Sequence, residues 1–198
     1  MADAGRVIAG SARGVRLAAP GPGTRSLTDR VKQTLFGILE PELDGAAVLD
    51  LFAGSGAGGI EALSRGAASA VFVERDAGAV RVIAENLRRT GLEADATVVR
   101  RDAVAWLAAA AKGPDGDDAV RFDIVLVDPP YADTASLARV LEGVSPVVRG
   151  GGIVVSKHFW RTAPPPLIGL LASERERRFG ETALTFYRRR GPQEAGEA

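Results

Sequence analysis

The sequence predicts an α/β protein built on a doubly wound, mostly parallel β-sheet. Short apolar stretches without a clean polar alternation recur between stretches whose apolar residues have helical spacing. This pattern is typical of strands that are buried on both faces and connected by helices. The rhythm changes after Lys157, where two strand-like segments follow each other and favour a terminal antiparallel hairpin.

The composition fits one globular domain with a proper core. The chain has 198 residues, of which 46% are hydrophobic, and it contains no cysteine and one histidine. Disulfides are therefore excluded and no metal site is expected. No apolar run reaches the roughly 18 residues that span a bilayer, and the N-terminus lacks the apolar core of a secretory signal. We therefore expect a cytoplasmic protein without a membrane partner.

Positive charge is concentrated near the start of the chain. The net charge is zero, but residues 1–35 contain six basic and two acidic residues, which gives this segment a charge of +4. Phosphate binding depends on such local clusters, because electrostatic fields decay within about 10 Å at ordinary salt. A solvated positive face explains the charge equally well. The candidate RNA-binding residues are Arg6, Arg13, Arg16 and Arg30.

Residues 1–25 are predicted to form a small basic appendage. "RVIAG" and "GVRLA" flank "SARG" and predict a β-hairpin, and the following "PGPG" predicts a loop. From Ser26 onward, apolar residues at helical spacing predict a helix that ends before Pro41. Ser26 and Asp29 resemble a capping box at its start.

Residues 26–190 are predicted to form the main domain. Strands are expected at "AAVLDLF", "AVFVE", "ATVVRRD" and "FDIVLVD", and helices at "GGIEALSRG", "AGAVRVIAENLRRTG", "AVAWLAAAA" and "TASLARVLEGV". A fifth strand, "GGIVVSK", and a short helix after Pro164–Pro166 precede the closing hairpin of "ERERRFG" and "TALTFYRRR". Residues 191–198 are predicted to be a disordered tail.

A glycine-rich turn follows the first of these strands. In "LDLFAGSGAGGIEAL", Asp50 ends the strand, and Gly54, Gly56 and Gly59 precede the helix. Glycine permits a tight turn and lets backbone N–H groups approach a ligand. Glu74, twenty residues after Gly54, could hold ribose hydroxyls. A nicotinamide enzyme and a methyltransferase both fit this pattern, because both bind an adenosine ribose.

Four successive strands end in an acidic residue, namely Asp50, Glu74, Asp102 and Asp128. The carboxyl ends of parallel strands form the ligand crevice of such sheets. Asp102 and the N–H of Ala103 could bind an adenine edge, although a helix cap alone also accounts for Asp102. Four like charges are costly unless a ligand with hydroxyls, an amino group or a cation lies among them. S-adenosylmethionine carries all of these groups.

The stretch "VLVDPPYADT" ends a buried strand at Asp128, because Pro129 and Pro130 have no N–H to donate to the sheet. Asp128 and the Pro129 carbonyl can accept hydrogen bonds from the two N–H groups of an exocyclic amine on a nucleobase and orient the amine for in-line methyl transfer. Tyr131 can stack on the base. A nicotinamide oxidoreductase leaves this motif unexplained, and its intactness disfavours an inactive RNA-binding module.

At these residues the sequence resembles the class I, Rossmann-like S-adenosylmethionine-dependent methyltransferases with a D/N-PP-Y/F/W motif. It is more closely similar to the 16S ribosomal RNA guanine-N2 methyltransferase (RsmD-like) family, from "RVIAGSARGVRL" through "SLTDRVKQTLFGIL" to "FGETALTFYRR". The resemblance implies a seven-stranded sheet that ends in a reversed hairpin. It also implies S-adenosylmethionine as the cofactor and N2 of a guanine in small-subunit (16S) ribosomal RNA as the acceptor.

The resemblance also implies the site residues. The implied cofactor-binding residues are Asp50, Phe52, Ala53, Gly54, Ser55, Gly56, Glu74, Arg75, Asp102 and Ala103. The implied catalytic residues are Asp128, Pro129, Pro130 and Tyr131.

Several alternatives remain open. The residues alone do not select guanine N2 over adenine N6 or cytosine N4, so an adenine-N6 DNA or RNA methyltransferase is the nearest alternative. DNA enzymes of this kind commonly need a separate target-recognition domain, for which the chain has no room. The expected partner is ribosomal RNA, free or within a 30S subunit or assembly intermediate, and the expected state is a monomer. His158 is expected at a surface or sheet edge, Trp106 in the core, and Trp160 either in packing or against RNA.

Overall fold

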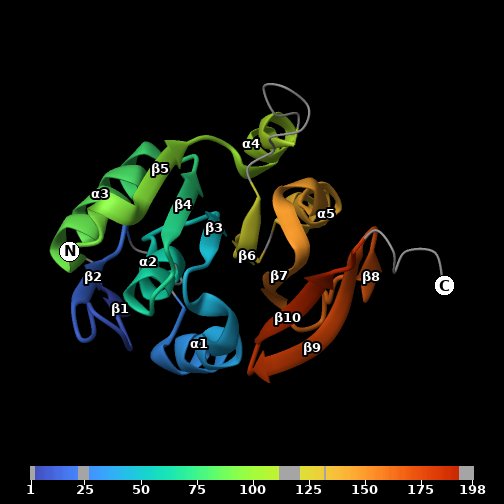
Figure 1. Ribbon diagram of the computed structural model, residues 1–198, viewed down its shortest axis with the longest axis horizontal. Coiled ribbons are helices and arrows are strands. Elements are labelled where there is room, and N and C mark those ends of the chain that lie inside the picture. Colours follow the sequence, from blue (N-terminus) through green and yellow to red (C-terminus); the bar gives the residue numbers. More distant parts are fainter. Residues whose placement is uncertain (1–2, 22–26, 112–120, 132, 192–198) are drawn as a thin grey trace. The chain divides into compact units, whose positions relative to one another are not determined.

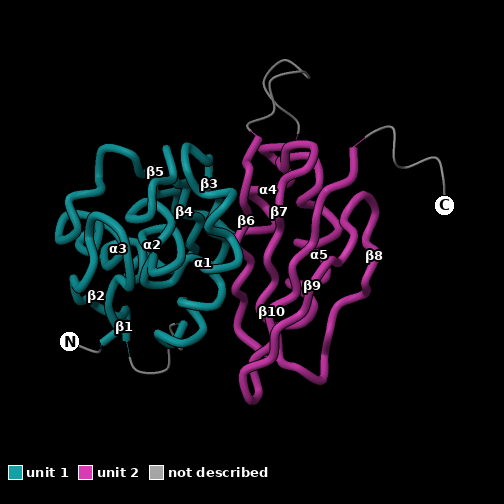
Figure 2. Tube along the Cα trace, turned by 60° about the horizontal axis from the view of Figure 1, so that its bottom comes forward, with its two compact units in different colours: residues 1–102 teal, residues 103–198 magenta. Residues whose placement is uncertain are grey.

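The computed structural model describes residues 3–21, 27–111, 121–131 and 133–191. Contacts divide the chain into two compact units, unit 1 (Met1–Asp102) and unit 2 (Ala103–Ala198), which Figure 2 distinguishes by colour. Their helices and strands are labelled in Figure 1. Ser26 lies outside the described residues, as does the predicted tail apart from Gly191.

Unit 1 contains three parallel strands in the order β5 (Ala96–Arg100), β4 (Ser69–Glu74) and β3 (Ala47–Leu51). Helices α2 (Ala57–Ser64) and α3 (Ala77–Thr90) connect them. A one-turn 3₁₀ helix, η1 (Glu93–Asp95), precedes β5. The buried side chains of β3 and β4 pack against buried residues of the two helices. The unit therefore has the βαβαβ order that the sequence predicts.

The N-terminal hairpin is formed by β1 (Asp3–Arg6) and β2 (Arg16–Ala18), which pair antiparallel. The first strand begins earlier than predicted, at Asp3, but backbone hydrogen bonds from the Val7 N–H to Val15 and from the Gly14 N–H to Val7 continue the hairpin toward the predicted turn. The side chains of Ala4, Val7 and Leu17 are buried. The hairpin is thus part of the packed structure of unit 1.

Helix α1 (Asp29–Leu43) differs from the prediction at both ends. Thr28 is the N-cap and accepts a hydrogen bond from the Val31 N–H, so the capping role assigned to Ser26 is wrong. The helix continues through Pro41 and does not end before it. Proline removes one backbone donor, but in the last turn this loss is small compared with the burial of Leu39 and Leu43.

Unit 2 contains five strands in the order β6 (Phe122–Val127), β7 (Val148–Phe159), β10 (Thr182–Arg189), β9 (Leu171–Phe179) and β8 (Leu167–Ile168). β6 and β7 pair parallel, whereas β7, β10, β9 and β8 pair antiparallel. Helices α4 (Ala103–Ala110) and α5 (Thr134–Gly143) and the 3₁₀ helix η2 (Ser145–Val147) complete the unit. The predicted closing hairpin is therefore confirmed as β9 and β10.

Three local predictions in unit 2 need correction. The residues after Pro166 form the two-residue strand β8, and not a short helix, so the described residues contribute one strand more than the seven expected for the main sheet. His158 lies inside β7 and is 2% exposed, and its two ring nitrogens hydrogen-bond to the Thr185 hydroxyl and to the Phe159 carbonyl. Trp106 is half-buried, with its ring 6.2 Å from that of Phe122. None of the described helices is long and apolar enough to cross a membrane.

Candidate functional site

The turn from β3 to α2 is held by two acidic side chains that bond to backbone N–H groups. Asp50 is 4% exposed, and its carboxylate accepts a 2.8 Å hydrogen bond from the Gly59 N–H. Glu74, at the end of β4, accepts hydrogen bonds from the Gly54 N–H at 2.9 Å and the Asp76 N–H at 2.8 Å. Two of the predicted cofactor-binding acids thus fix the shape of the glycine-rich turn.

Phe52 is the one non-glycine residue with positive φ in the described part of the chain, at 61°. This left-handed conformation costs about 1–3 kcal/mol and persists only where neighbouring interactions impose it. The Ala53 N–H donates to the Val73 carbonyl at 3.2 Å, and the Gly56 N–H donates to the Ala53 carbonyl at 2.7 Å. Backbone strain of this kind is often found at ligand sites, and here it coincides with the predicted cofactor turn.

Two glycines of the motif are required for different reasons, and Gly59 lies within α2 and not in the turn before the helix, where it was expected. Gly56 caps α2 with φ of 78°, a conformation that residues with a side chain rarely adopt. A Cβ at Gly59 would lie 2.4 Å from the Phe72 ring, so only glycine lets α2 pack this closely on β4. These are the tight-turn and close-packing roles of a nucleotide-binding glycine motif.

The remaining predicted cofactor-binding residues lie around this turn and at the end of β5. Ala53 and Ser55 are buried, Arg75 is exposed, and Asp102 is half-buried directly before α4. Ala103 is the first residue of α4 and belongs to unit 2. Each Glu74 oxygen bonds to one N–H, and a carboxylate oxygen has further acceptor capacity. Glu74 can therefore hold the turn and still accept a ribose hydroxyl.

Asn86 is a residue of this region that the sequence prediction missed. It is fully buried on α3, and its amide donates to the carbonyls of Ser55 and Ala18, both at 2.9 Å. Its carbonyl accepts from the Ala18 N–H at 2.8 Å. Asn86 thereby joins the glycine-rich turn to the N-terminal hairpin. Its position on the apolar face of α3, three residues after Ile83, was the signal that could have identified it.

In unit 2, Asp128 directly follows β6 and begins the DPPY motif. Pro129 is buried and Pro130 is exposed, and the Pro130 carbonyl accepts a 2.8 Å bond from Asp133, the N-cap of α5. The Tyr131 hydroxyl lies 2.5 Å from the Thr182 hydroxyl at the start of β10. The strand end, the turn and the helix cap together fix this motif.

Lys157 of β7 forms an ion pair with Asp128, with Nζ 2.5 Å from Oδ1, and sequence analysis did not select it. The Lys157 side chain is 10% exposed and that of Asp128 is 26% exposed. The Lys157 ammonium also lies 5.4 Å from the centre of the Tyr131 ring. A lysine at the end of the apolar run "GGIVVSK" was the available signal, because buried lysines require a partner.

The electrostatic environment of Asp128 is balanced between two effects. Burial raises the pKa of Asp128 above its ordinary value, because desolvation penalises the charged form, and this effect is larger than the opposing attraction of Lys157. About a quarter of the side chain remains accessible to solvent. The carboxylate is thus partly desolvated, held by one cation, and still able to accept a hydrogen bond from a ligand.

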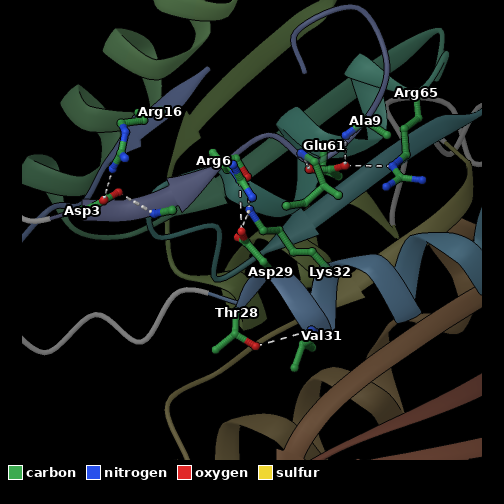
Figure 3. A network of polar contacts seen from close by, with 12 residues as sticks. Asp3, Arg6, Ala9, Arg16, Thr28, Asp29, Val31, Lys32, Glu61 and Arg65 are labelled. Carbon is green, nitrogen blue, oxygen red and sulfur yellow. Dashed lines mark hydrogen bonds and ion pairs between the residues drawn. The ribbon is translucent and has the colours of Figure 1, made fainter. Parts of the chain in front are cut away.

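The basic residues of the N-terminal region have different environments (Figure 3). Arg6 pairs with Asp29 at 3.2 Å and Arg16 pairs with Asp3 at 2.9 Å, while Arg6, Arg13, Arg16 and Arg30 are all exposed. Lys32 is fully buried, and its ammonium donates to the Arg6 carbonyl. Burial lowers the pKa of Lys32, and this side chain is not available to RNA. The accessible positive charge is therefore smaller than the sequence count suggests.

Comparison with known proteins identifies the family of this chain. The model of the family described as Conserved hypothetical protein 95 matches residues 5–188, which include both the glycine-rich turn and the DPPY motif. The chain belongs to this family. The predicted resemblance to the RsmD-like methyltransferases is confirmed by this match and by the relatives described next.

Individual relatives and solved structures extend the match. "Putative rRNA methyltransferase YlbH" of Bacillus subtilis is 39% identical over 188 residues, which cover 94% of this chain and all of that protein. Ribosomal RNA small subunit methyltransferase D of Escherichia coli is 44% identical over 127 residues, 64% of this chain and 60% of that protein. The solved structure of yhhF from Escherichia coli superposes with a TM-score of 0.80 at 34% identity, covering 93% of this chain and 97% of that one.

The solved structures confirm the predicted fold class. HI0767 from Haemophilus influenzae, at 27% identity and a TM-score of 0.75, covers 96% of this chain and all of its own. This chain therefore has the class I methyltransferase fold, and its N-terminal hairpin and C-terminal antiparallel strands are those expected from the sequence.

Proposed function

We propose that this protein transfers a methyl group from S-adenosylmethionine to the N2 amine of a guanine in small-subunit ribosomal RNA. The observation that carries the proposal is the DPPY motif, in which the partly exposed Asp128 carboxylate precedes two prolines and the half-buried ring of Tyr131. A carboxylate acceptor next to an aromatic ring matches the needs of a flat base with an exocyclic amine.

The coarser part of this function, S-adenosylmethionine-dependent methylation of ribosomal RNA, is supported by the relatives. Those with extensive identity are named as ribosomal RNA methyltransferases, and the match to YlbH spans that whole protein. A further neighbour, SMU.776 of 12% identity and TM-score 0.62, is a methyltransferase complexed with SAH and shares the fold alone. The choice of guanine N2 depends on the family resemblance of the sequence.

The residues of unit 1 fit S-adenosylmethionine. In the turn, Gly54 and Gly56 both have positive φ, and Glu74 has spare acceptor capacity for ribose hydroxyls. We propose that Glu74 binds the ribose and that Asp102 and Ala103 bind the adenine. The turn from Phe52 to Gly56 would contact the remainder of the cofactor. When bound, the cofactor supplies an electrophilic methyl group on a sulfonium.

The residues of unit 2 orient the acceptor amine. In this proposal the Asp128 carboxylate and the Pro129 carbonyl accept hydrogen bonds from the two N–H groups of the amine, so that the nitrogen lone pair is directed at the methyl group. The carboxylate also stabilises the positive charge that develops on nitrogen during attack. Pro129 and Pro130 restrict the backbone, and Tyr131 stacks on the base. The proton leaves the methylated nitrogen to a nearby acceptor or water.

An adenine-N6 methyltransferase uses the same chemistry and is the second candidate, because the motif residues contact only the amine and the face of the base. A nicotinamide oxidoreductase is disfavoured, since it gives no role to the Asp128–Lys157 pair beside Tyr131. We further propose that the enzyme acts as a monomer in the cytoplasm, on ribosomal RNA that is free or within an assembling 30S subunit. Arg6, Arg13, Arg16 and Arg30 are its proposed phosphate contacts.

The test is a comparison of modified nucleosides in 16S ribosomal RNA from cells with and without this protein, by mass spectrometry. We expect the loss of one N2-methylguanosine. RNA from the deleted strain should regain the modification when treated with purified protein and S-adenosylmethionine. Loss of an N6-methyladenosine instead would favour the second candidate, and an unchanged set of nucleosides would overturn the proposal.

A further inference from the structure

The edge of unit 2 next to the DPPY motif carries a cluster of rings and arginines that the proposed reaction does not use. β7, β10 and β9 come together there, with Phe159, Thr182 and Phe179 in register as cross-strand neighbours. The Tyr131 hydroxyl bonds to Thr182, so this row of residues is in direct contact with the motif.

Three aromatic rings follow one another from the motif outward. The ring centres of Tyr131 and Phe159 are 6.5 Å apart, and those of Phe159 and Trp160 are 6.4 Å apart, in tilted arrangements. All three residues are half-buried, so parts of their surfaces face solvent. The Trp160 backbone N–H donates to the Glu181 carbonyl at 3.1 Å, which fixes Trp160 relative to β10.

Two exposed guanidinium groups pack on the last of these rings. The guanidinium carbon of Arg178, on β9, is 3.6 Å from the centre of the Trp160 ring, and that of Arg161 is 4.8 Å from it. Arg178 is oriented further by a bond from its Nε to the Gly180 carbonyl at 2.9 Å. Among the described residues of unit 2, neither Arg161 nor Arg178 forms an ion pair with a carboxylate.

This arrangement has the chemistry of a single-stranded RNA site. Two like charges against one ring repel each other, and a polyanion that binds there would relieve the repulsion. Guanidinium planes and indole faces both stack on bases, while guanidinium N–H groups bind phosphate oxygens in pairs. A protein partner with acidic side chains would satisfy the charges but would leave the sequence of rings without a role.

We propose that Trp160, Arg161 and Arg178 bind the nucleotide next to the target base in single-stranded RNA. The base stacks on the Trp160–guanidinium surface, and the arginines contact the adjoining phosphates. The inference depends on the proposed function, because it places this nucleotide beside a base held at Asp128 and Tyr131. The ring of Phe159 fills the space between the two positions.

Binding is measured by fluorescence anisotropy with a fluorescein-labelled 12-nucleotide oligoadenylate and with 16S RNA transcribed in vitro. Trp160→Ala should weaken oligoadenylate binding about 5- to 150-fold, the effect of removing the stacking platform of one base, without changing the salt dependence. Arg178→Ala and Arg161→Ala should each reduce the slope of log affinity against log salt by about 0.7. Trp160→Phe should retain most of the affinity.

Arg175→Ala is the matched control, because Arg175 is an exposed arginine on the same strand whose cross-strand neighbour is the buried Phe186 and not Trp160. Its effect on affinity should be less than twofold. In methylation assays, the Trp160 and Arg178 variants should show a raised KM for RNA with little change in kcat. Both variants should keep the melting temperature of the unchanged protein and its affinity for S-adenosylhomocysteine. If Trp160→Ala fails to fold, Arg178→Ala still tests the inference.

Equal oligoadenylate affinities of the unchanged protein, Trp160→Ala and Arg178→Ala would overturn this inference. So would variants that lose methylation of assembled 30S particles only, because that result would indicate a protein contact. The proposed function fails separately, if the unchanged protein transfers no methyl group to 16S RNA. Binding and methylation are measured on the same samples, so the two failures are distinguishable.

Discussion

The acidic residues of unit 1 and the acidic residue of the DPPY motif in unit 2 are held in different ways. In unit 1, Asp50, Glu74 and Glu61 all accept hydrogen bonds from backbone N–H groups, which belong to the glycine-rich motif or to the N-terminal hairpin. In unit 2, Asp128 is held by the side chain of Lys157. One set of carboxylates shapes the backbone, and the other carboxylate is positioned by a single lysine ammonium that also affects its pKa.

Under the proposed function, this difference separates the residues that bind the cofactor from those that take part in methyl transfer. A backbone fixed by buried carboxylates is prepared for a cofactor before it binds, because little ordering remains to be done. A carboxylate held by one lysine keeps acceptor capacity for a substrate, and its protonation depends on that lysine. Changes to the unit 1 acids should therefore affect folding and cofactor affinity, and changes to the Asp128–Lys157 pair should affect turnover.

The largest expected effect comes from Asp128→Ala. Removal of the acceptor should reduce kcat for methyl transfer about 100- to 1000-fold, the range seen when one preorganised hydrogen-bonding group is removed from an active site. S-adenosylhomocysteine should still raise the melting temperature, because the proposed cofactor-binding residues of unit 1 are unchanged. Asp123→Ala, at the start of the same strand, is the control and should retain activity. If S-adenosylhomocysteine no longer raised the melting temperature of Asp128→Ala, the separation between the unit 1 acids and Asp128 would be contradicted.

Glu61→Ala tests the structural role of acids in unit 1. Glu61 is fully buried, accepts from the Ile8 and Ala9 N–H groups at 2.8 and 3.1 Å, and pairs with Arg65 at 2.8 Å. Its removal leaves these donors without their acceptor and should cost about 3 kcal/mol of stability. The melting temperature should fall by about 6–12 °C in calorimetry.

Glu40→Ala is the control for that measurement. Glu40 pairs with the same Arg65 at 2.9 Å, but its side chain is 62% exposed. Its removal should change stability by less than about 0.5 kcal/mol. Similar losses for the two variants would contradict the special role of the buried carboxylate.

Lys157→Met tests, through the pH dependence of activity, whether Lys157 controls the protonation of Asp128. Asp128 accepts hydrogen bonds from the amine best when it is charged, so activity should fall as the pH decreases through its pKa. Burial already raises this pKa, and Lys157 opposes the rise, so removal of the ammonium should move the acid limb of kcat/KM to higher pH. Lys157→Arg should leave the limb near its original position. An acid limb that does not move in Lys157→Met would show that the pair does not tune the reaction.

The smallest effect is expected from Arg13→Ala combined with Arg16→Ala. Both side chains are exposed, and Arg16 is already paired with Asp3. RNA affinity should decrease, and the salt slope should fall by about 0.7 for each arginine that binds a phosphate in the unchanged protein. Affinity for S-adenosylhomocysteine should not change in calorimetric titration. An unchanged salt slope would exclude the hairpin arginines as phosphate ligands.

Local sequence patterns predicted most of the fold. Strands and helices of the βα repeats occur where the apolar periodicity placed them, and the turn after β3 and the stop at Asp128 follow from glycine and proline, whose effects act within a few residues. The errors arose where packing outweighed local preference. α1 continues past Pro41 because burial of its last turn compensates one missing hydrogen bond, and His158 is buried because β10 supplies Thr185 as a partner.

The sequence by itself determined the fold class, the family and the two motifs. Each depends on short stretches of neighbouring residues whose apolar spacing, glycines and prolines set the local backbone conformation. Tertiary structure alone decided which partners the buried polar groups acquire. Lys157 reaches Asp128 from another strand, Asn86 links residues 31 and 68 positions away, and Lys32 is withdrawn from the basic surface. Charge burial and ion pairing depend on distances between residues far apart in the chain, and periodicity carries no information about those distances.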